Sequence, residues 1–148
     1  MQTLASNPAF MVYALATLVL CLNLMFLWGY SGGVRGKTKT ALNPEDAATV
    51  AKGAQVTETD PPEVARVLRA HRNAEANIYP FLALGLVFVL LGGPAEHAKI
   101  IFGIFVGARW LHSIVYLAGK QPWRTLSFVI GAFAILGLMG DIVWLLLK

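Results

Sequence analysis

Residues 126–147 read LSFVIGAFAILGLMGDIVWLLL and contain a single charged residue, Asp141. An α-helix rises about 1.5 Å per residue, so about 20 mainly apolar residues cross a hydrocarbon core of about 30 Å. This stretch is long enough and apolar enough to do so. It therefore predicts a membrane-spanning helix at the end of the chain.

Three further apolar runs precede this stretch. Residues 11–28 and 81–91 are uncharged, and residues 100–118 contain one arginine. The run at 81–91 is too short to cross a bilayer and must borrow residues upstream. We expect four spans, at about 8–30, 62–91, 98–118 and 125–147.

The composition supports a membrane protein, because 57% of the 148 residues are hydrophobic and only 14% are charged. The predicted fold class is an all-α integral membrane protein, and residues 1–148 form a single domain. The short outer connection at residues 92–97 favours an up-and-down bundle of antiparallel helices. Four spans leave no room for a soluble domain.

The basic residues indicate the orientation. Nine of them follow the first and third spans: Arg35, Lys37, Lys39, Lys52, Arg66, Arg69, Arg72, Lys120 and Arg124. The other side offers only Lys99 and Lys148. By the positive-inside rule both termini are outside or lumenal, and the loop at about 31–61 is cytosolic. The net charge of +4 then reflects topology and contact with membrane lipids, and no nucleic acid is expected as a partner.

The first run is not expected to be a cleaved signal peptide, since no Lys or Arg precedes it. Ser31, Gly32 and Gly33 are expected to end the first helix. Asn43 and Pro44 predict a short cytosolic helix over about 44–51. Asp60 is expected to cap the second long helix, which should start near Pro61.

Polar residues within the spans are costly and therefore mark candidate functional sites. Arg69, Arg72 and Asn73 share one stripe of the second helix, with Glu75 on its flank. Helical spacing also aligns a second group of polar residues, Arg109, His112 and Tyr116, on the third helix. Both lines lead to the cytosolic end, where the chain also places Arg35, Arg124 and Thr125.

Such a cluster suits a small polyanionic ligand with a reactive group. The planar fork of arginine holds a carboxylate with two hydrogen bonds, and a tripeptide with two carboxylates and a thiol fits this requirement. A nearby cation such as Arg124 lowers the pKa of a thiol and so favours the nucleophilic thiolate. Apolar clefts between the helices would admit a lipophilic second substrate from the bilayer.

The second helix carries a specific motif. The segment 66–73, RVLRAHRN, continues with NIYPF at 77–81 and resembles the signature of the MAPEG family, the membrane-associated proteins in eicosanoid and glutathione metabolism. Further matching segments are Val34-Arg35, Asn43-Pro44-Glu45-Asp46, Arg109-Trp110-Leu111-His112, Tyr116-Leu117 and Arg124. The resemblance covers nearly the whole chain.

The resemblance implies a homotrimer that binds glutathione between neighbouring subunits near the cytosolic face. It implies that Arg124 activates the thiol and that Asp46 is a second catalytic group. The glutathione-binding residues that it implies are Arg35, Arg72, Asn73, His112, Tyr116, Arg124 and Thr125. The family commonly has a glutamate where this chain has Ala76, and Glu75 stands one position earlier, so Glu75 is a candidate replacement. No metal site is expected.

Three functions remain open. The first is a glutathione transferase or peroxidase that acts on lipophilic electrophiles or lipid hydroperoxides. The second is a glutathione-dependent isomerase of an endoperoxide. The third is a non-catalytic lipid-binding partner of another enzyme, which would not need the arginine cluster. A transporter is disfavoured because the chain shows no inverted repeat or pair of broken helices.

Overall fold

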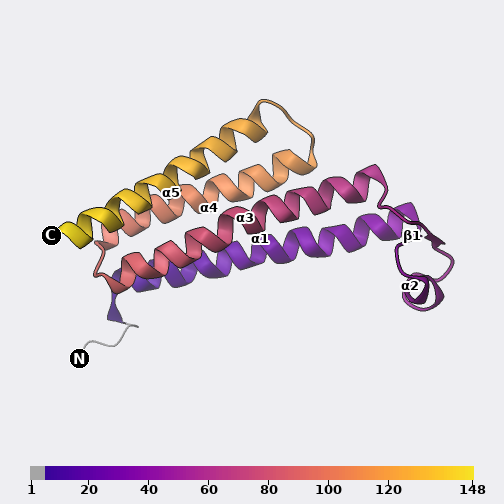
Figure 1. Ribbon diagram of the computed structural model, residues 1–148, viewed down its shortest axis with the longest axis horizontal. Coiled ribbons are helices and arrows are strands. Elements are labelled where there is room, and N and C mark those ends of the chain that lie inside the picture. The colour runs from indigo at the N-terminus through magenta and orange to yellow at the C-terminus, as the bar shows by residue number, and fades with distance from the viewer. Residues whose placement is uncertain (1–5) are drawn as a thin grey trace.

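The computed structural model describes residues 6–148. Four long helices lie side by side, with the start of the first long helix and the C-terminus at one end of the bundle (Figure 1). We call this the terminal end. The opposite end, where the chain passes from the first long helix to the second and from the third to the fourth, is called the loop end. The elements are α1 (Pro8–Thr38), β1 (Thr40–Ala41), α2 (Pro44–Ala48), β2 (Gln55–Val56), α3 (Pro62–Leu90), α4 (Ala95–Leu117) and α5 (Trp123–Leu147).

The predicted fold is confirmed, since α1, α3, α4 and α5 are each long and apolar enough to cross a membrane. Their order along the chain is up and down, and short turns join α3 to α4 and α4 to α5 (Figure 1). Leucines, isoleucines and valines are exposed along all four helices, as expected for surfaces that face lipid.

Helix α1 corrects one prediction. It begins after Asn7, whose Oδ1 accepts hydrogen bonds from the backbone N–H groups of Ala9 and Phe10. It does not end at residues 31–33 but continues to Thr38, and Lys39 then adopts a left-handed conformation. Glycine destabilises a helix by only about 1 kcal/mol and ends it only where the backbone turns left-handed.

The loop segment between α1 and α3 differs from the prediction in two further ways. Helix α2 ends at Ala48 rather than near residue 51, and a two-residue parallel pairing of β1 with β2 closes the segment. Asp60 does not cap α3; its Oδ1 lies 2.8 Å from Nη2 of Arg35 in an ion pair. A long-range partner has thus replaced the local cap.

The bundle core is aromatic at its centre. The rings of Phe81 on α3 and Phe105 on α4 stack with centroids 3.8 Å apart, and Phe102 meets Phe81 edge to face at 5.2 Å. All three side chains are buried. Helix α4 packs against both α1 and α5, so it forms the middle of the bundle.

Gly93 lies at the tight turn between α3 and α4, and a Cβ atom there would collide with the buried ring of Phe88. We expect Gly93→Ala to lower the free energy of unfolding by about 1–3 kcal/mol, because the ring has no free space to move into. Gly103→Ala is the matched control, since its Cβ would meet nothing within 4 Å in this chain. Reversible unfolding in mixed detergent micelles measures the free energy of unfolding of both variants. Equal values for Gly93→Ala and Gly103→Ala would contradict the expectation.

Candidate functional site

A cavity of about 290 Å³ opens between α3, α4 and α5 at the loop end. Five of its six lining residues are polar, and the sixth is Phe128. The lining residues are Asn73 on α3, His112 and Tyr116 on α4, and Arg124, Thr125 and Phe128 on α5. Five residues predicted from the sequence as ligand-binding therefore surround one cavity.

Arg124 stands in the first turn of α5, directly after the turn that joins it to α4. Its guanidinium carbon lies 4.9 Å from the centroid of the Tyr116 ring, a cation–π contact that orients the cation. The Gln121 amide, with its oxygen turned toward Arg124, accepts from Nη2 at 2.8 Å and from Nε at 3.2 Å. The same amide then donates to Oγ1 of Thr125 at 3.1 Å. Arg124 is thus held from two sides.

His112 is almost completely buried, with 3% of its surface exposed. Its Nδ1 donates to the backbone carbonyl of Arg124 at 3.0 Å, and the hydroxyl of Ser127 donates to the same carbonyl. This arrangement places the proton of a neutral imidazole on Nδ1 and leaves Nε2 as an acceptor. Nε2 has no hydrogen-bond partner within residues 6–148. His112 thus contributes to the cavity lining a buried acceptor, Nε2, that no described residue satisfies.

Arg109 contacts Asn73 of the cavity wall and is completely buried. Its Nη2 donates to Oδ1 of Asn73 at 2.8 Å, while its Nε and Nη1 have no partner within the described part of the chain. The methylene group of Arg109 packs where Gly131 of α5 leaves space. Asn73 thus links the cavity wall to a buried cation.

Removing the Asn73 side chain is expected to destabilise the bundle, because it leaves a buried cation without its only side-chain partner among residues 6–148. We expect Asn73→Ala to lower the free energy of unfolding by about 3 kcal/mol, measured without ligand. Asn77→Ala is the control on the same helix, since it removes only a hydrogen bond to the Asn73 carbonyl. The double variant Asn73→Ala with Arg109→Met should regain most of the lost free energy of unfolding. Equal losses in Asn73→Ala and Asn77→Ala would contradict the expectation.

Four predicted residues lie outside the cavity. Arg35 pairs with Asp60 and lines a separate cavity of about 570 Å³ with Lys39 and Lys52. Asp46 stands in α2 and accepts a hydrogen bond from Nδ2 of Asn43. The other two are on α3: Arg72, which is exposed, and Glu75.

Glu75 does not turn toward the cavity. One carboxylate oxygen accepts a hydrogen bond from the Tyr79 hydroxyl at 3.2 Å, and the other lies 3.6 Å from Nδ1 of His71. Both partners are one helical turn away on α3. Within residues 6–148, no carboxylate lines this cavity.

Sequence reasoning missed Gln121 and Ser127. Ser127 stands three residues after Arg124, so helical spacing alone would have placed it on the same face of the last helix. Gln121 lies in the turn before α5, where no periodic pattern predicts its direction. The contact between Asn73 and Arg109 joins two predicted polar stripes, but the sequence did not say which members would meet.

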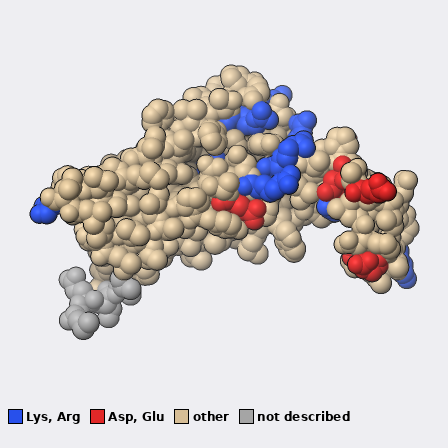
Figure 2. Space-filling view, viewed as in Figure 1, with Lys and Arg blue, Asp and Glu red and all other residues tan. Residues whose placement is uncertain are grey.

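On the face shown in Figure 2, lysines and arginines gather toward the loop end, and most of the remaining bundle carries no charge. This distribution agrees with the polar residues around the cavity and with the apolar lengths of the four helices. The candidate site is therefore at the boundary between the apolar bundle and the charged loop end.

Comparison with known proteins gives one consistent result. The model of the MAPEG family matches residues 13–144. Microsomal glutathione S-transferase 1 of Rattus norvegicus is 38% identical over 135 residues, which cover 88% of this chain and 86% of the relative. Prostaglandin E synthase of Equus caballus is 36% identical over 137 residues, covering 88% of each chain. Both names are those of enzymes, and the chain is an integral, multi-pass membrane enzyme that belongs to the MAPEG family.

Proposed function

We propose that this enzyme binds glutathione in the cavity at the loop end and joins it through its sulfur to lipophilic electrophiles or uses it to reduce lipid hydroperoxides. The observation that carries the proposal is the meeting of Arg124 with the unpaired, buried Nε2 of His112 around one cavity. Relatives named as a glutathione S-transferase and a prostaglandin E synthase support glutathione-dependent chemistry at the level of the family.

The residues present fit a peptide anion. Arg124 offers a planar set of donors for an anionic group, and Asn73, Tyr116 and Thr125 add polar side chains on three helices. His112 Nε2 accepts a hydrogen bond from a ligand N–H or S–H group. The cavity volume of about 290 Å³ is near the lower limit of the usual range for small-molecule sites.

The thiol of glutathione supplies the nucleophile for both reactions. Arg124 stabilises the negative charge on sulfur and lowers the pKa of the thiol from its ordinary value of about 8.5. In conjugation, a sulfur–carbon bond forms while the leaving group departs with its electron pair, and the thiol proton passes to water. In reduction, two glutathione molecules give up two electrons, and the hydroperoxide becomes an alcohol and water.

We also propose that the enzyme is a homotrimer in which each site lies between two subunits. Arg35 and Asp46 do not line the cavity of their own chain, and in this proposal a neighbouring subunit brings them to it. In this arrangement Arg35 and the exposed Arg72 hold the carboxylates of the tripeptide. Asp46 acts as a second catalytic group that exchanges protons with the second substrate.

The loop end faces the cytosol in this proposal, and both termini are outside or lumenal. The support is the distribution of basic residues, which are concentrated in the loops at that end. Lipophilic second substrates then enter from the bilayer, and glutathione enters from the cytosol.

Isomerisation of an endoperoxide is the second candidate function, because prostaglandin E synthases of several mammals are 34–36% identical to the chain. The same thiolate would attack one peroxide oxygen and be regenerated when the product forms. A non-catalytic lipid-binding role has weaker support, because such a role gives no reason for the arginine that the chain has at position 124.

Glutathione binding to the detergent-solubilised oligomer tests the proposal. Calorimetry should show saturable binding, and ultraviolet difference spectra should show thiolate absorbance. S-methylglutathione is the control, because it should bind without that absorbance. Turnover is then compared for an aryl halide, a lipid hydroperoxide and an endoperoxide. An intact oligomer that binds no glutathione would refute both enzymatic readings.

A further inference from the structure

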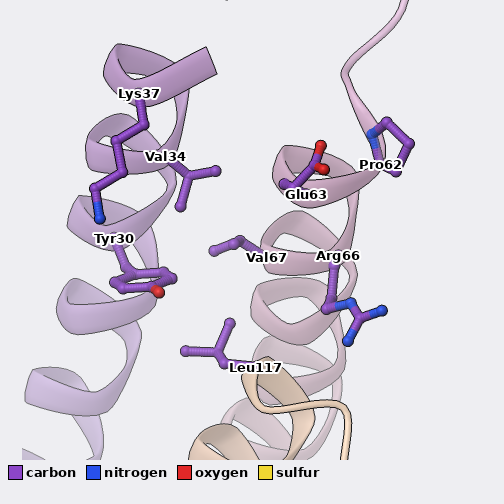
Figure 3. Close-up of a pocket in the computed structure, with 8 residues that line it drawn as sticks. All are labelled: Tyr30, Val34, Lys37, Pro62, Glu63, Arg66, Val67 and Leu117. Carbon is purple, nitrogen blue, oxygen red and sulfur yellow. The ribbon is translucent and has the colours of Figure 1, made fainter.

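A second cavity at the loop end, with a volume of about 350 Å³, lies between α1, α3 and the end of α4. It shares no residue with the candidate glutathione site. Figure 3 shows Tyr30, Val34 and Lys37 on α1, facing Pro62, Glu63, Arg66 and Val67 on α3, with Leu117 below. Val34, Val67 and Leu117 lie between the two helices, so the inner part of the cavity is apolar.

Two cations line the cavity from opposite sides, and in Figure 3 the ammonium of Lys37 and the guanidinium of Arg66 point away from each other. Lys37 and Arg66 form no ion pair with any carboxylate in residues 6–148. Among residues 6–148, Glu63 is the one acid that lines the cavity, and in Figure 3 its carboxylate points away from Arg66. The cavity therefore combines an apolar floor with two uncompensated positive charges.

The position of Arg66 depends on Gly119 in the turn after α4. Gly119 has a φ of +67°, and a Cβ atom there would collide with Nη1 of Arg66. The missing side chain thus lets the guanidinium lie against the turn. This contact joins the α4–α5 turn to the cavity without using a hydrogen-bond donor of Arg66, so those donors stay available for a ligand.

The cavity lies where the apolar part of the bundle ends. Trp28 and Tyr30 are exposed on α1 just before its first arginine, a pattern typical of a membrane interface. From Tyr30 a strip of rings leads back along the bundle: Tyr30 to Phe26 and Phe26 to Trp110 both have centroid separations of 5.8 Å. An acyl chain lying on this strip would place its headgroup at the two cations.

We propose that this cavity binds the headgroup of one anionic phospholipid per subunit. Lys37 and Arg66, which point away from each other in Figure 3, turn toward the phosphate when the lipid binds. The glycerol backbone rests on the apolar floor, and one acyl chain follows the rings of Phe26 and Trp110. A soluble phosphate compound would use the cations but not the apolar floor or the strip of rings. The inference is independent of the glutathione chemistry proposed above.

Native mass spectrometry of the intact oligomer, titrated with short-chain phosphatidylglycerol, tests the proposal. One lipid per chain should bind, in preference to phosphatidylcholine of the same chain length. Lys37→Ala with Arg66→Ala should weaken binding about 25-fold, since each basic residue near an anionic lipid contributes about fivefold. The matched control Lys99→Ala with Lys148→Ala removes the same charge at the terminal end and should leave the affinity unchanged.

Leu117→Phe is a second variant that fills the cavity without changing any charge, and it should also weaken lipid binding. Size-exclusion chromatography and circular dichroism of the detergent-solubilised oligomer report whether each variant is folded, independently of glutathione binding. The proposal is overturned if the wild-type oligomer binds no phosphatidylglycerol, or if inorganic phosphate displaces the lipid at equal concentration. Unchanged affinity in folded Leu117→Phe overturns it even if the double variant fails to assemble.

Discussion

Replacement of Arg124 by alanine is expected to lower turnover by about two to three orders of magnitude while the protein stays folded. Among residues 6–148 of one chain, Arg124 is the one Lys or Arg that lines the cavity, so its loss removes the charge that stabilises the sulfur anion in the ground and transition states. The pKa of bound thiol should return to about 8.5. Thiolate absorbance of the bound complex, measured across a pH titration, checks the shift directly.

Arg124→Lys separates charge from geometry. Lysine keeps the positive charge but loses the planar fork that meets Tyr116 and Gln121. We expect part of the thiolate signal to survive and turnover to stay well below wild type. Thr125→Ala is the matched control next in sequence and should cost less than tenfold. An Arg124→Ala variant with full thiolate absorbance would show that another group activates the thiol.

Mixing two inactive variants is expected to restore activity. If Arg35 serves the site of a neighbouring subunit, then Arg35→Ala and Arg124→Ala chains form a complete site wherever each supplies its intact residue. In the proposed trimer, a ring that contains both chains has both intact residues at one of its three sites, so isolated mixed oligomers should show about one third of the wild-type turnover. Co-expression with two affinity tags isolates the mixed oligomers, whose turnover is then measured.

The opposite result has an equally definite meaning. If Arg35 and Arg124 act in the same subunit, every chain in the mixture lacks one of the two residues, so no site is complete and activity stays at background. Arg124→Ala mixed with His112→Phe is the control, because both residues line one cavity of one chain. That mixture should remain inactive in either case.

Hydropathy predicted the four long helices because an apolar run in a bilayer has few alternatives to a helix. The end of α1 was not predicted correctly, since Gly32 and Gly33 weaken a helix without turning it, and Lys39 supplies the left-handed residue instead. The parallel pairing of β1 with β2 also had no signal, because strands of two residues are too short for a pattern.

Helical spacing explains how much of the site was predictable. Asn73, His112 and Tyr116 fall on stripes that converge at the loop end, and the structure places them around one cavity with Arg124. The ion pair of Arg35 with Asp60 joins residues far apart in sequence, so no local pattern predicts it. Glu75 remains with local partners because a shift of one residue turns a helical side chain by about 100°.

Because α1 continues as one helix through residues 31–33, a change in its tilt moves its C-terminal end. Arg35 lies about 40 Å along the helix axis from Pro8, so a change in tilt of about 10° displaces it by about 7 Å. Helices adjust their tilt to the thickness of the surrounding bilayer. Where Arg35 contributes to the site of a neighbouring subunit, the thickness of the host membrane therefore sets how closely that arginine approaches the ligand.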